Sequence, residues 1–393
     1  MTTSAAQIRA FTGPALLSYG FRPFFLFGAL WAALAVALWI PILTGHLVLP
    51  SALGPVQWHV HELVFGYVPA IVAGFLLTAV PNWTGRLPVV GTRLATLFLV
   101  WVAGRIAIFC SLEIGIVLAA VIDLSFLAAL GLLIAREILA SKNTHNLKVL
   151  AGVGLLLLGN ALFHLEAIAG FGDGHGTRVG VAAIVLLIML IGGRIIPSFT
   201  RNWLARRGAG RMPAPFDRFD LVVMVASGIA LATWVVMPSA IATAAAAAIA
   251  AALNVTRLGR WAGERTTAEP LVLILHIAYA FVPIGFALLA LAIVRPDIAA
   301  SSGALHGWTT GAIGVMTLAV MTRASLGHTG QPLTATRSIQ FIYLAAVVAA
   351  LARITVAFDI LHDPMLHLAA TAWVLAFGGF VIVYAPLLMR RRT

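Results

Sequence analysis

The chain has 393 residues, of which 61% are hydrophobic and 10% are charged, whereas a soluble domain carries about 25% charged residues. This composition excludes a soluble globular protein and indicates a protein embedded in a lipid bilayer. The net charge of +12 would suit nucleic-acid binding, but the basic residues lie between apolar runs, so we expect no nucleic-acid partner.

Apolar runs of about 20 residues, the length needed to cross a bilayer, follow one another along the chain. They predict an all-α, polytopic membrane protein with about 12 transmembrane helices, because barrel strands need only roughly 10 alternating residues. We expect Pro81 and Pro197 to end their helices, since proline interrupts a helix. The whole chain, residues 1–393, would form a single integral membrane domain. In chain order the predicted spans are 21–43, 57–81, 92–110, 113–139, 147–170, 177–200, 217–237, 238–258, 269–294, 303–325, 335–357 and 364–389.

Basic residues set the predicted orientation of these spans. Most of the 25 lysines and arginines fall in alternate loops and at the two ends of the chain. Because basic residues favour the cytoplasmic side, both the N-terminus and the C-terminus are predicted to be cytoplasmic. The alternation also identifies the outer end of each helix, and so it predicts the depth of each histidine.

Cys110 is the only cysteine in the sequence. A single cysteine excludes an internal disulfide, a cysteine-ligated iron–sulfur cluster and the two-cysteine attachment of a c-type haem. A haem in this chain would therefore be held without a covalent link, most simply by histidine, and haem b is the form that we expect.

The most informative motif, Trp58-His-Val-His-Glu62, opens the second span at its outer end. Ionisable groups at the edge of the hydrocarbon are costly and usually mark a site, and imidazole is a common ligand of haem iron and copper. His59 and His61 are about 200° apart on a regular helix, so either only one binds a given metal or the helix is irregular there. Glu62 is the candidate proton carrier. The alternative is that these residues only form a polar cap at the interface.

The other candidate ligands come from distant parts of the chain. His164 and His306 lie near the outer ends of the fifth and tenth spans, and His276 lies in the ninth. His328 follows the tenth span on the inner face. The alternatives are interhelical hydrogen bonds for His276 and His306 and an ordinary loop position for His328. The candidate metal ligands are thus His59, His61, His164, His276, His306 and His328, of which His61, His276 and His306 are also the candidates for haem.

Arg105 and Arg353, in the third and eleventh spans, are each followed by isoleucine. A guanidinium at such a position could pair with a haem propionate, or it could extend to the lipid interface. The remaining histidines are expected to be solvated loop residues: His46, His145, His175, His362 and His367.

A faint internal repeat links three of the spans. The second, sixth and tenth end in comparable sequences, and each is preceded by a histidine near its outer end: His59 or His61, His175 and His306. This pattern suggests a three-fold repeat of four helices. Such a repeat would set the histidine-bearing helices around a central axis, an arrangement that resembles haem–copper oxidases.

Taken together, these motifs resemble the NnrS family of bacterial membrane proteins over nearly the whole chain. The resemblance implies a multi-pass protein of the bacterial inner (cytoplasmic) membrane that contains haem and copper. It also implies a role in denitrification and in protection against nitric oxide, that is, against nitrosative stress. The matching stretches are Phe21-Arg-Pro-Phe-Phe25, Trp58-His-Val-His-Glu-Leu-Val-Phe-Gly66, Gly74-Phe-Leu-Leu-Thr-Ala-Val-Pro-Asn-Trp-Thr-Gly85, Gly193-Arg-Ile-Ile-Pro197 with Thr200, His276-Ile-Ala-Tyr279, Leu305-His306, Gly311-Ala-Ile-Gly314 and Met321-Thr-Arg-Ala-Ser-Leu-Gly-His-Thr-Gly330.

The function that fits best is redox chemistry on nitric oxide, with reduction to nitrous oxide as its enzymatic form. Haem iron and a copper held by imidazoles suit such chemistry, and Glu62 would admit the protons. Electrons would come from quinol or another membrane donor, because the chain contains no donor domain. The alternatives are a haem-dependent protein that binds nitric oxide without turnover, and a proton-coupled secondary transporter.

Overall fold

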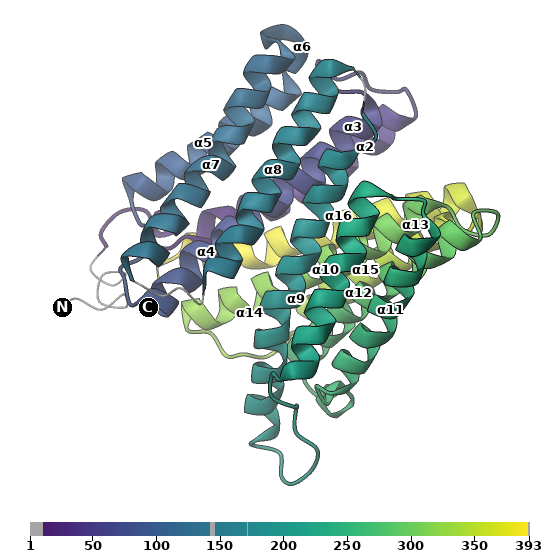
Figure 1. Ribbon diagram of the computed structural model, residues 1–393. Helices are drawn as coiled ribbons and strands as arrows, with labels where there is room; N and C mark the ends of the chain where they lie inside the picture. Colours follow the sequence, from purple (N-terminus) through teal and green to yellow (C-terminus); the bar gives the residue numbers. More distant parts are fainter. Residues whose placement is uncertain (1–10, 142–145, 171, 392–393) are drawn as a thin grey trace. The chain divides into compact units, whose positions relative to one another are not determined.

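The computed structural model describes residues 11–141, 146–170 and 172–391, and these residues form helices and connecting segments without a β-strand (Figure 1). Twelve of the helices are long and apolar enough to cross a membrane. The predicted fold class, an all-α polytopic membrane protein, is therefore confirmed. His145, expected to be a loop residue, lies outside the described residues.

The observed helices match the predicted spans closely, and no end differs by more than four residues. Two spans consist of consecutive helical segments that include a stretch of π-helix, which has one extra residue per turn. The spans are α2 (Phe21–Leu43), α3 (Pro55–His61) with the π-helix η2 (Glu62–Tyr67) and α4 (Val68–Thr84), α5 (Thr92–Phe109), α7 (Ile116–Ala140), α8 (Leu147–Ala169), α9 (His175–Leu204), α10 (Arg218–Val236), α11 (Ile241–Gly259), α12 (Pro270–Val294), α13 (Ser301–His306) with the π-helix η5 (Gly307–Val315) and α14 (Met316–Thr329), α15 (Arg337–Val356) and α16 (His362–Met389).

Two helices continue beyond the prolines that were expected to end them. α4 runs three residues past Pro81, and α9 runs seven residues past Pro197. Proline removes one backbone donor, and within a membrane protein neighbouring groups can accommodate that loss without ending the helix. The expectation of a helix end at these prolines was therefore wrong.

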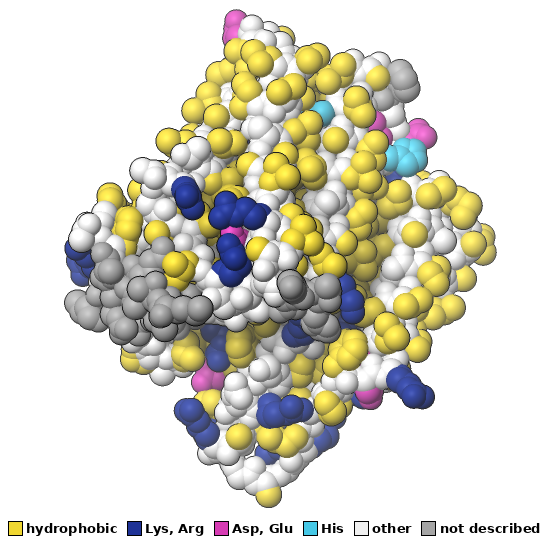
Figure 2. Space-filling model, turned by 60° about the vertical axis from the view of Figure 1, so that its left-hand side comes forward, with side chains coloured by type: hydrophobic (Ala, Val, Ile, Leu, Met, Phe, Trp, Pro, Cys, Tyr) yellow, Lys and Arg dark blue, Asp and Glu magenta, His cyan; other side chains and the backbone are white. Residues whose placement is uncertain are grey.

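Large apolar side chains face outwards on the spans, as a lipid environment requires. Leu99 on α5 is 62% exposed, and Leu132 on α7 is 73% exposed. Figure 2 shows hydrophobic side chains over much of the visible surface, with lysine and arginine side chains in separate groups. A bilayer covers such a surface, because lipid tails are as apolar as these side chains.

The chain divides into two compact units. That residues 1–393 form a single integral membrane domain stays a prediction. Unit 1 comprises Met1–Gly180, Gly327–Gln331 and Phe377–Thr393, and unit 2 comprises Val181–Leu326 and Pro332–Ala376. In unit 1, α7 packs against both α5 and α8, which run beside it (Figure 1). Phe24 of α2 contacts Phe98 and Phe126, so α2 packs on the same layer.

A closed polar network joins helices of unit 2. Arg257 of α11 donates to Asp220 Oδ1 at 2.8 Å and to the hydroxyl of Tyr279 at 2.9 Å, and that hydroxyl donates to Asn254 Oδ1 at 2.8 Å. At the start of α10, outside the membrane-spanning segments, hydrogen bonds from the Arg260 guanidinium lower the pKa of Asp217 to about 2. Because Arg257, Asp220 and Tyr279 are paired with one another, their network serves packing rather than ligand binding.

Glycines bring the backbones of α8 and the first turns of α9 into direct contact within unit 1. A Cβ added to Gly176 would lie 2.2 Å from the backbone nitrogen of Phe163, and one added to Gly159 would lie 2.6 Å from that of Gly180. Since real Cβ contacts are never this short, either addition would force the helices apart. This close contact sets the position of Phe163 and of its neighbour, His164.

Replacing Gly176 by alanine is therefore expected to lower the free energy of unfolding by about 1–3 kcal/mol, the usual effect of overpacking. Gly154→Ala on α8 is the matched control, because no atom lies within 4 Å of its added Cβ. That control should not destabilise the protein, since alanine favours a helix more than glycine does. Thermal unfolding of both variants in detergent tests this, and equal melting temperatures would contradict the proposed contact.

Candidate metal centre

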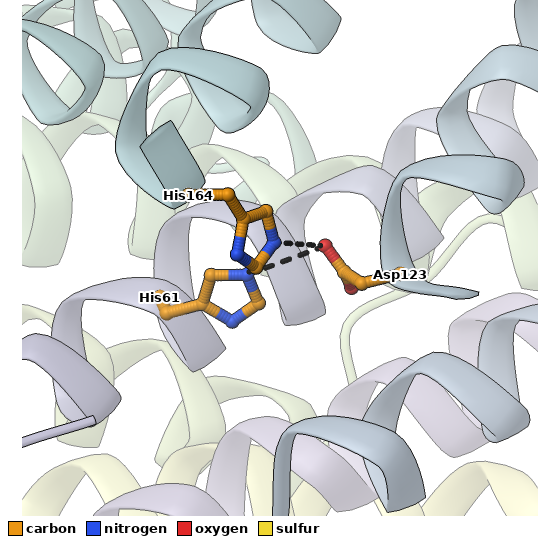
Figure 3. Close-up of side chains that lie close together, drawn as sticks. All are labelled: His61, Asp123 and His164. Atoms are coloured by element: carbon orange, nitrogen blue, oxygen red, sulfur yellow. Dashed lines mark hydrogen bonds and ion pairs between the residues drawn. The ribbon is translucent and has the colours of Figure 1, made fainter. Parts of the chain in front are cut away.

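Three buried side chains of unit 1 bring potential metal ligands together (Figure 3). His61 Nε2 lies 3.3 Å from Asp123 Oδ2 and 3.3 Å from His164 Nε2, and His164 Nε2 lies 3.1 Å from Asp123 Oδ2. None of the three residues is more than 2% exposed. We call His61, Asp123 and His164 the metal group.

The metal group joins three different spans. His61 is the last residue of α3, Asp123 lies in the second turn of α7, and His164 lies near the end of α8. If α3 and α7 begin at the outer face, as the basic residues predict, all three lie in the outer half of the membrane.

A change in helical geometry occurs next to His61. The π-helix η2 begins at Glu62, immediately after it. His59 lies on another side of the helix and stacks on Trp39 of α2 at 4.0 Å between ring centroids. The structure thus places only His61, and not His59, in the metal group.

Asp123 is the centre of several polar contacts. Asn160 Nδ2 donates to its Oδ2 at 2.7 Å, and Arg105 donates to its Oδ1. Arg105 also donates to Glu62 Oε2 at 2.7 Å, so one guanidinium joins both carboxylates. Gly66 gives the arginine room, since a Cβ there would lie 2.2 Å from Arg105 Nη1.

Glu62 is fully buried and accepts hydrogen bonds from three side chains. His61 Nδ1 lies 3.0 Å from its Oε1, and Trp31 Nε1 lies 2.6 Å from its Oε2, which also faces Arg105. Since each of these groups can donate a proton, the contacts suit an acceptor-only carboxylate. Glu62 therefore contacts His61 of the metal group directly and is linked to Asp123 through Arg105.

The spacing of the three ligand atoms fits a small transition-metal ion. With metal–ligand bonds of about 2.0–2.1 Å, a tetrahedral ion separates neighbouring ligand atoms by about 3.3 Å. The observed separations are 3.1–3.3 Å. Calcium prefers oxygen ligands, so the two imidazole nitrogens of the group favour a transition metal over calcium. Three protein ligands leave a fourth tetrahedral position for another molecule.

Two polar atoms beside the metal group lack a partner among the described residues. These atoms are His164 Nδ1 and Asn160 Oδ1, and both are buried. Buried polar atoms are normally satisfied by protein, water or ligand, so a further polar partner beside the metal group would be favourable.

The remaining predicted ligands lie elsewhere. His276, in unit 2, makes a hydrogen bond of 2.8 Å between its Nε2 and the hydroxyl of Thr200. His306, also in unit 2, donates from Nδ1 to the backbone oxygen of Ser302 at 2.7 Å. His328, in unit 1, packs against the rings of Tyr19 and Phe21.

The two predicted arginines differ in their surroundings. Arg105 is buried and joined to Glu62 and Asp123. Arg353 of α15 is half-buried, and its Nη1 has no hydrogen-bond partner among the described residues. Of the predicted residues, the structure therefore brings together His61, Glu62, Arg105 and His164.

Sequence reasoning missed Asp123, Asn160 and Trp31. Asp123 was detectable, because it is an acidic residue within the long apolar run of α7, and such residues usually have a function. Asn160 and Trp31 carry a weaker signal, since asparagine also makes structural hydrogen bonds between membrane helices and tryptophan is common near the interface.

Fold and site together define a polytopic α-helical membrane protein with a buried His–Asp–His candidate metal centre. The chain belongs to the NnrS protein family, whose model matches residues 15–392. The family predicted from the sequence motifs is thus confirmed. No curated protein matches the chain.

Proposed function

We propose that the metal group binds a copper ion in the bacterial inner membrane and that the protein uses it to act on nitric oxide. The observation that carries this proposal is the convergence of three potential ligand atoms, His61 Nε2, His164 Nε2 and Asp123 Oδ2. A proton can join only two of these atoms at a time, whereas a metal ion satisfies all three.

The charges around the metal group also favour a bound cation. Glu62 and Asp123 carry two negative charges, and Arg105 supplies one positive charge between them. With both imidazoles neutral, one negative charge is left without compensation in a buried place. Because an uncompensated buried charge is costly, a metal ion would stabilise this arrangement.

Copper is the ion that we propose for this group. Imidazole suits copper, zinc and iron, whereas purely oxygen-based sites suit magnesium and calcium. Among the three, copper is the one that the family resemblance implies. A bound copper would supply a redox-active centre with a position open to a diatomic ligand.

The metal group suits a compact ion better than a haem. Haem iron offers protein ligands only positions on its two faces, whereas His61, His164 and Asp123 converge on one point. For haem b we propose His306, because its Nδ1 donates to the backbone oxygen of Ser302, and a contact of this kind orients an imidazole that binds a metal. α13 packs against α15, which carries Arg353, and its guanidinium would meet a propionate.

Nitric oxide is a suitable substrate because it is small, uncharged and soluble in lipid. It needs no polar channel to reach a buried centre between apolar helices. Reduction of two nitric oxide molecules to nitrous oxide and water consumes two protons and two electrons. The electrons would come from quinol or another membrane donor.

Metal analysis and absorption spectroscopy of the detergent-purified protein test this proposal. We expect one copper per chain at the metal group, and a Soret band for the haem. Production of nitrous oxide by the reduced protein under anaerobic conditions would establish turnover. Spectral changes with nitric oxide, but without nitrous oxide, would establish binding alone. A metal-free, colourless protein that still protects cells from nitric oxide would overturn the proposal and leave transport as the alternative.

A further inference from the structure

Glu62 has the geometry of a residue that orients a metal ligand. Its Oε1 faces His61 Nδ1 at 3.0 Å, on the opposite side of the imidazole from the metal group. A carboxylate accepts but does not donate, so this contact holds the imidazole proton on Nδ1. In the neutral ring the lone pair is then on Nε2, which is the atom that faces Asp123 and His164.

The carboxylate of Glu62 is itself fixed from two further sides. Trp31 of α2 donates to Oε2 at 2.6 Å, and Arg105 of α5 donates to the same atom at 2.7 Å. These contacts come from two different helices, so they restrain the carboxylate in direction as well as position. A group with all these donors around it is held as an acceptor, which favours positioning over the transfer of protons.

We propose that Glu62 is a positioning residue that fixes the tautomer and the ring orientation of His61, and that Trp31 holds Glu62 in place. This inference rests on the proposed metal binding at His61, Asp123 and His164. Carboxylates that accept from the second nitrogen of a metal-bound histidine commonly raise metal affinity by about 10–100-fold.

Glu62→Gln is the main test. The glutamine side chain has nearly the same shape, but its single oxygen would accept from Trp31 Nε1 and Arg105, and its NH2 group would then face His61 Nδ1, where an acceptor is needed. We expect the affinity for Cu(II) to fall about 10–100-fold. We also expect a changed EPR spectrum of Cu(II) and a changed visible absorption of Co(II), because the imidazole would adopt another orientation.

Glu166→Gln is the matched control for this substitution. Glu166 lies near the end of α8, two residues from His164, and accepts from the backbone nitrogens of His175 and Gly176, outside the metal group. Copper affinity and both spectra should stay at their wild-type values in this control.

Trp31→Phe provides a second test that leaves every charge in place. It removes only the indole donor to Glu62. We expect a smaller loss of Cu(II) affinity, about 3–10-fold, because Trp31 acts on the metal ligand His61 only through Glu62. Trp39→Phe on the same helix is its control, since Trp39 Nε1 has no partner among the described residues. Trp31→Phe and Trp39→Phe together test whether Glu62 positions His61, even if Glu62→Gln does not fold.

The outcomes separate the two proposals. Failure of the wild-type protein to bind Cu(II) or Co(II) would overturn the metal site itself. Wild-type binding that Glu62→Gln and Trp31→Phe leave unchanged in affinity and in spectrum would overturn only the positioning role. Altered spectra in these two variants, with both controls unchanged, support it.

Discussion

Replacing His164 by alanine is expected to lower the affinity of the metal group for copper by more than about 100-fold. This is a larger loss than the roughly 10–100-fold that follows when a residue contacting a metal ligand is removed. The substitution removes one of only three converging ligand atoms, so the remaining pair can no longer enclose the ion. His61→Ala should have at least the same effect, because it also leaves Glu62 without the imidazole to which it is bonded.

The matched control for both variants is His59→Ala. His59 lies on the same helix as His61 but stacks on Trp39 and is not one of the three residues of the metal group. Copper content and affinity should therefore stay close to wild type. The measurement is titration of the metal-free protein with Cu(II), together with the metal content of the purified variants.

Thermal unfolding supplies an independent readout for the same variants. A ligand that binds only the folded state stabilises it by about 2.7 kcal/mol when its concentration is 100 times its dissociation constant. Copper should therefore raise the melting temperature of the wild type and of His59→Ala, but not of His164→Ala. An equal rise in His164→Ala would show that the ion binds elsewhere.

Replacing Arg105 by methionine is expected to destabilise the protein by about 3–5 kcal/mol, the usual cost of leaving a buried charge without its partner. Arg105 is the counter-charge that joins Glu62 and Asp123, and all three side chains are buried. Without it the two carboxylates repel each other, and His61 and His164 lose the arrangement that the metal group needs.

Arg93→Met on the same helix is the control for this variant, because Arg93 is exposed near the start of α5. Its effect should stay within about 0.5 kcal/mol, as for most surface substitutions. Combining Arg105→Met with Glu62→Gln and Asp123→Asn should restore part of the lost stability, since it removes the uncompensated charges. The lack of any recovery would show that packing, and not charge, is the role of Arg105.

The sequence by itself determined the class of the protein and the positions of its helices. Hydrophobic runs long enough to cross a bilayer are a local property, because in lipid each helix satisfies its own backbone hydrogen bonds. For the same reason the predicted ends of α2, at residues 21 and 43, coincide with the observed ones. The motif around His61 and Glu62 was also recognisable, since ionisable residues are rare in such runs.

Only the tertiary structure decided which residues form the site. Asp123 and His164 lie 62 and 103 residues from His61 in the sequence, and no local pattern predicts that three helices bring them within 3.3 Å. The same holds for the contacts of Glu62 with Trp31 and Arg105, on which the proposed positioning role rests. The proton-carrying role expected from the sequence stays a prediction. Helix formation follows from neighbouring residues, but the convergence of His61, Asp123 and His164 depends on how the faces of separate helices pack.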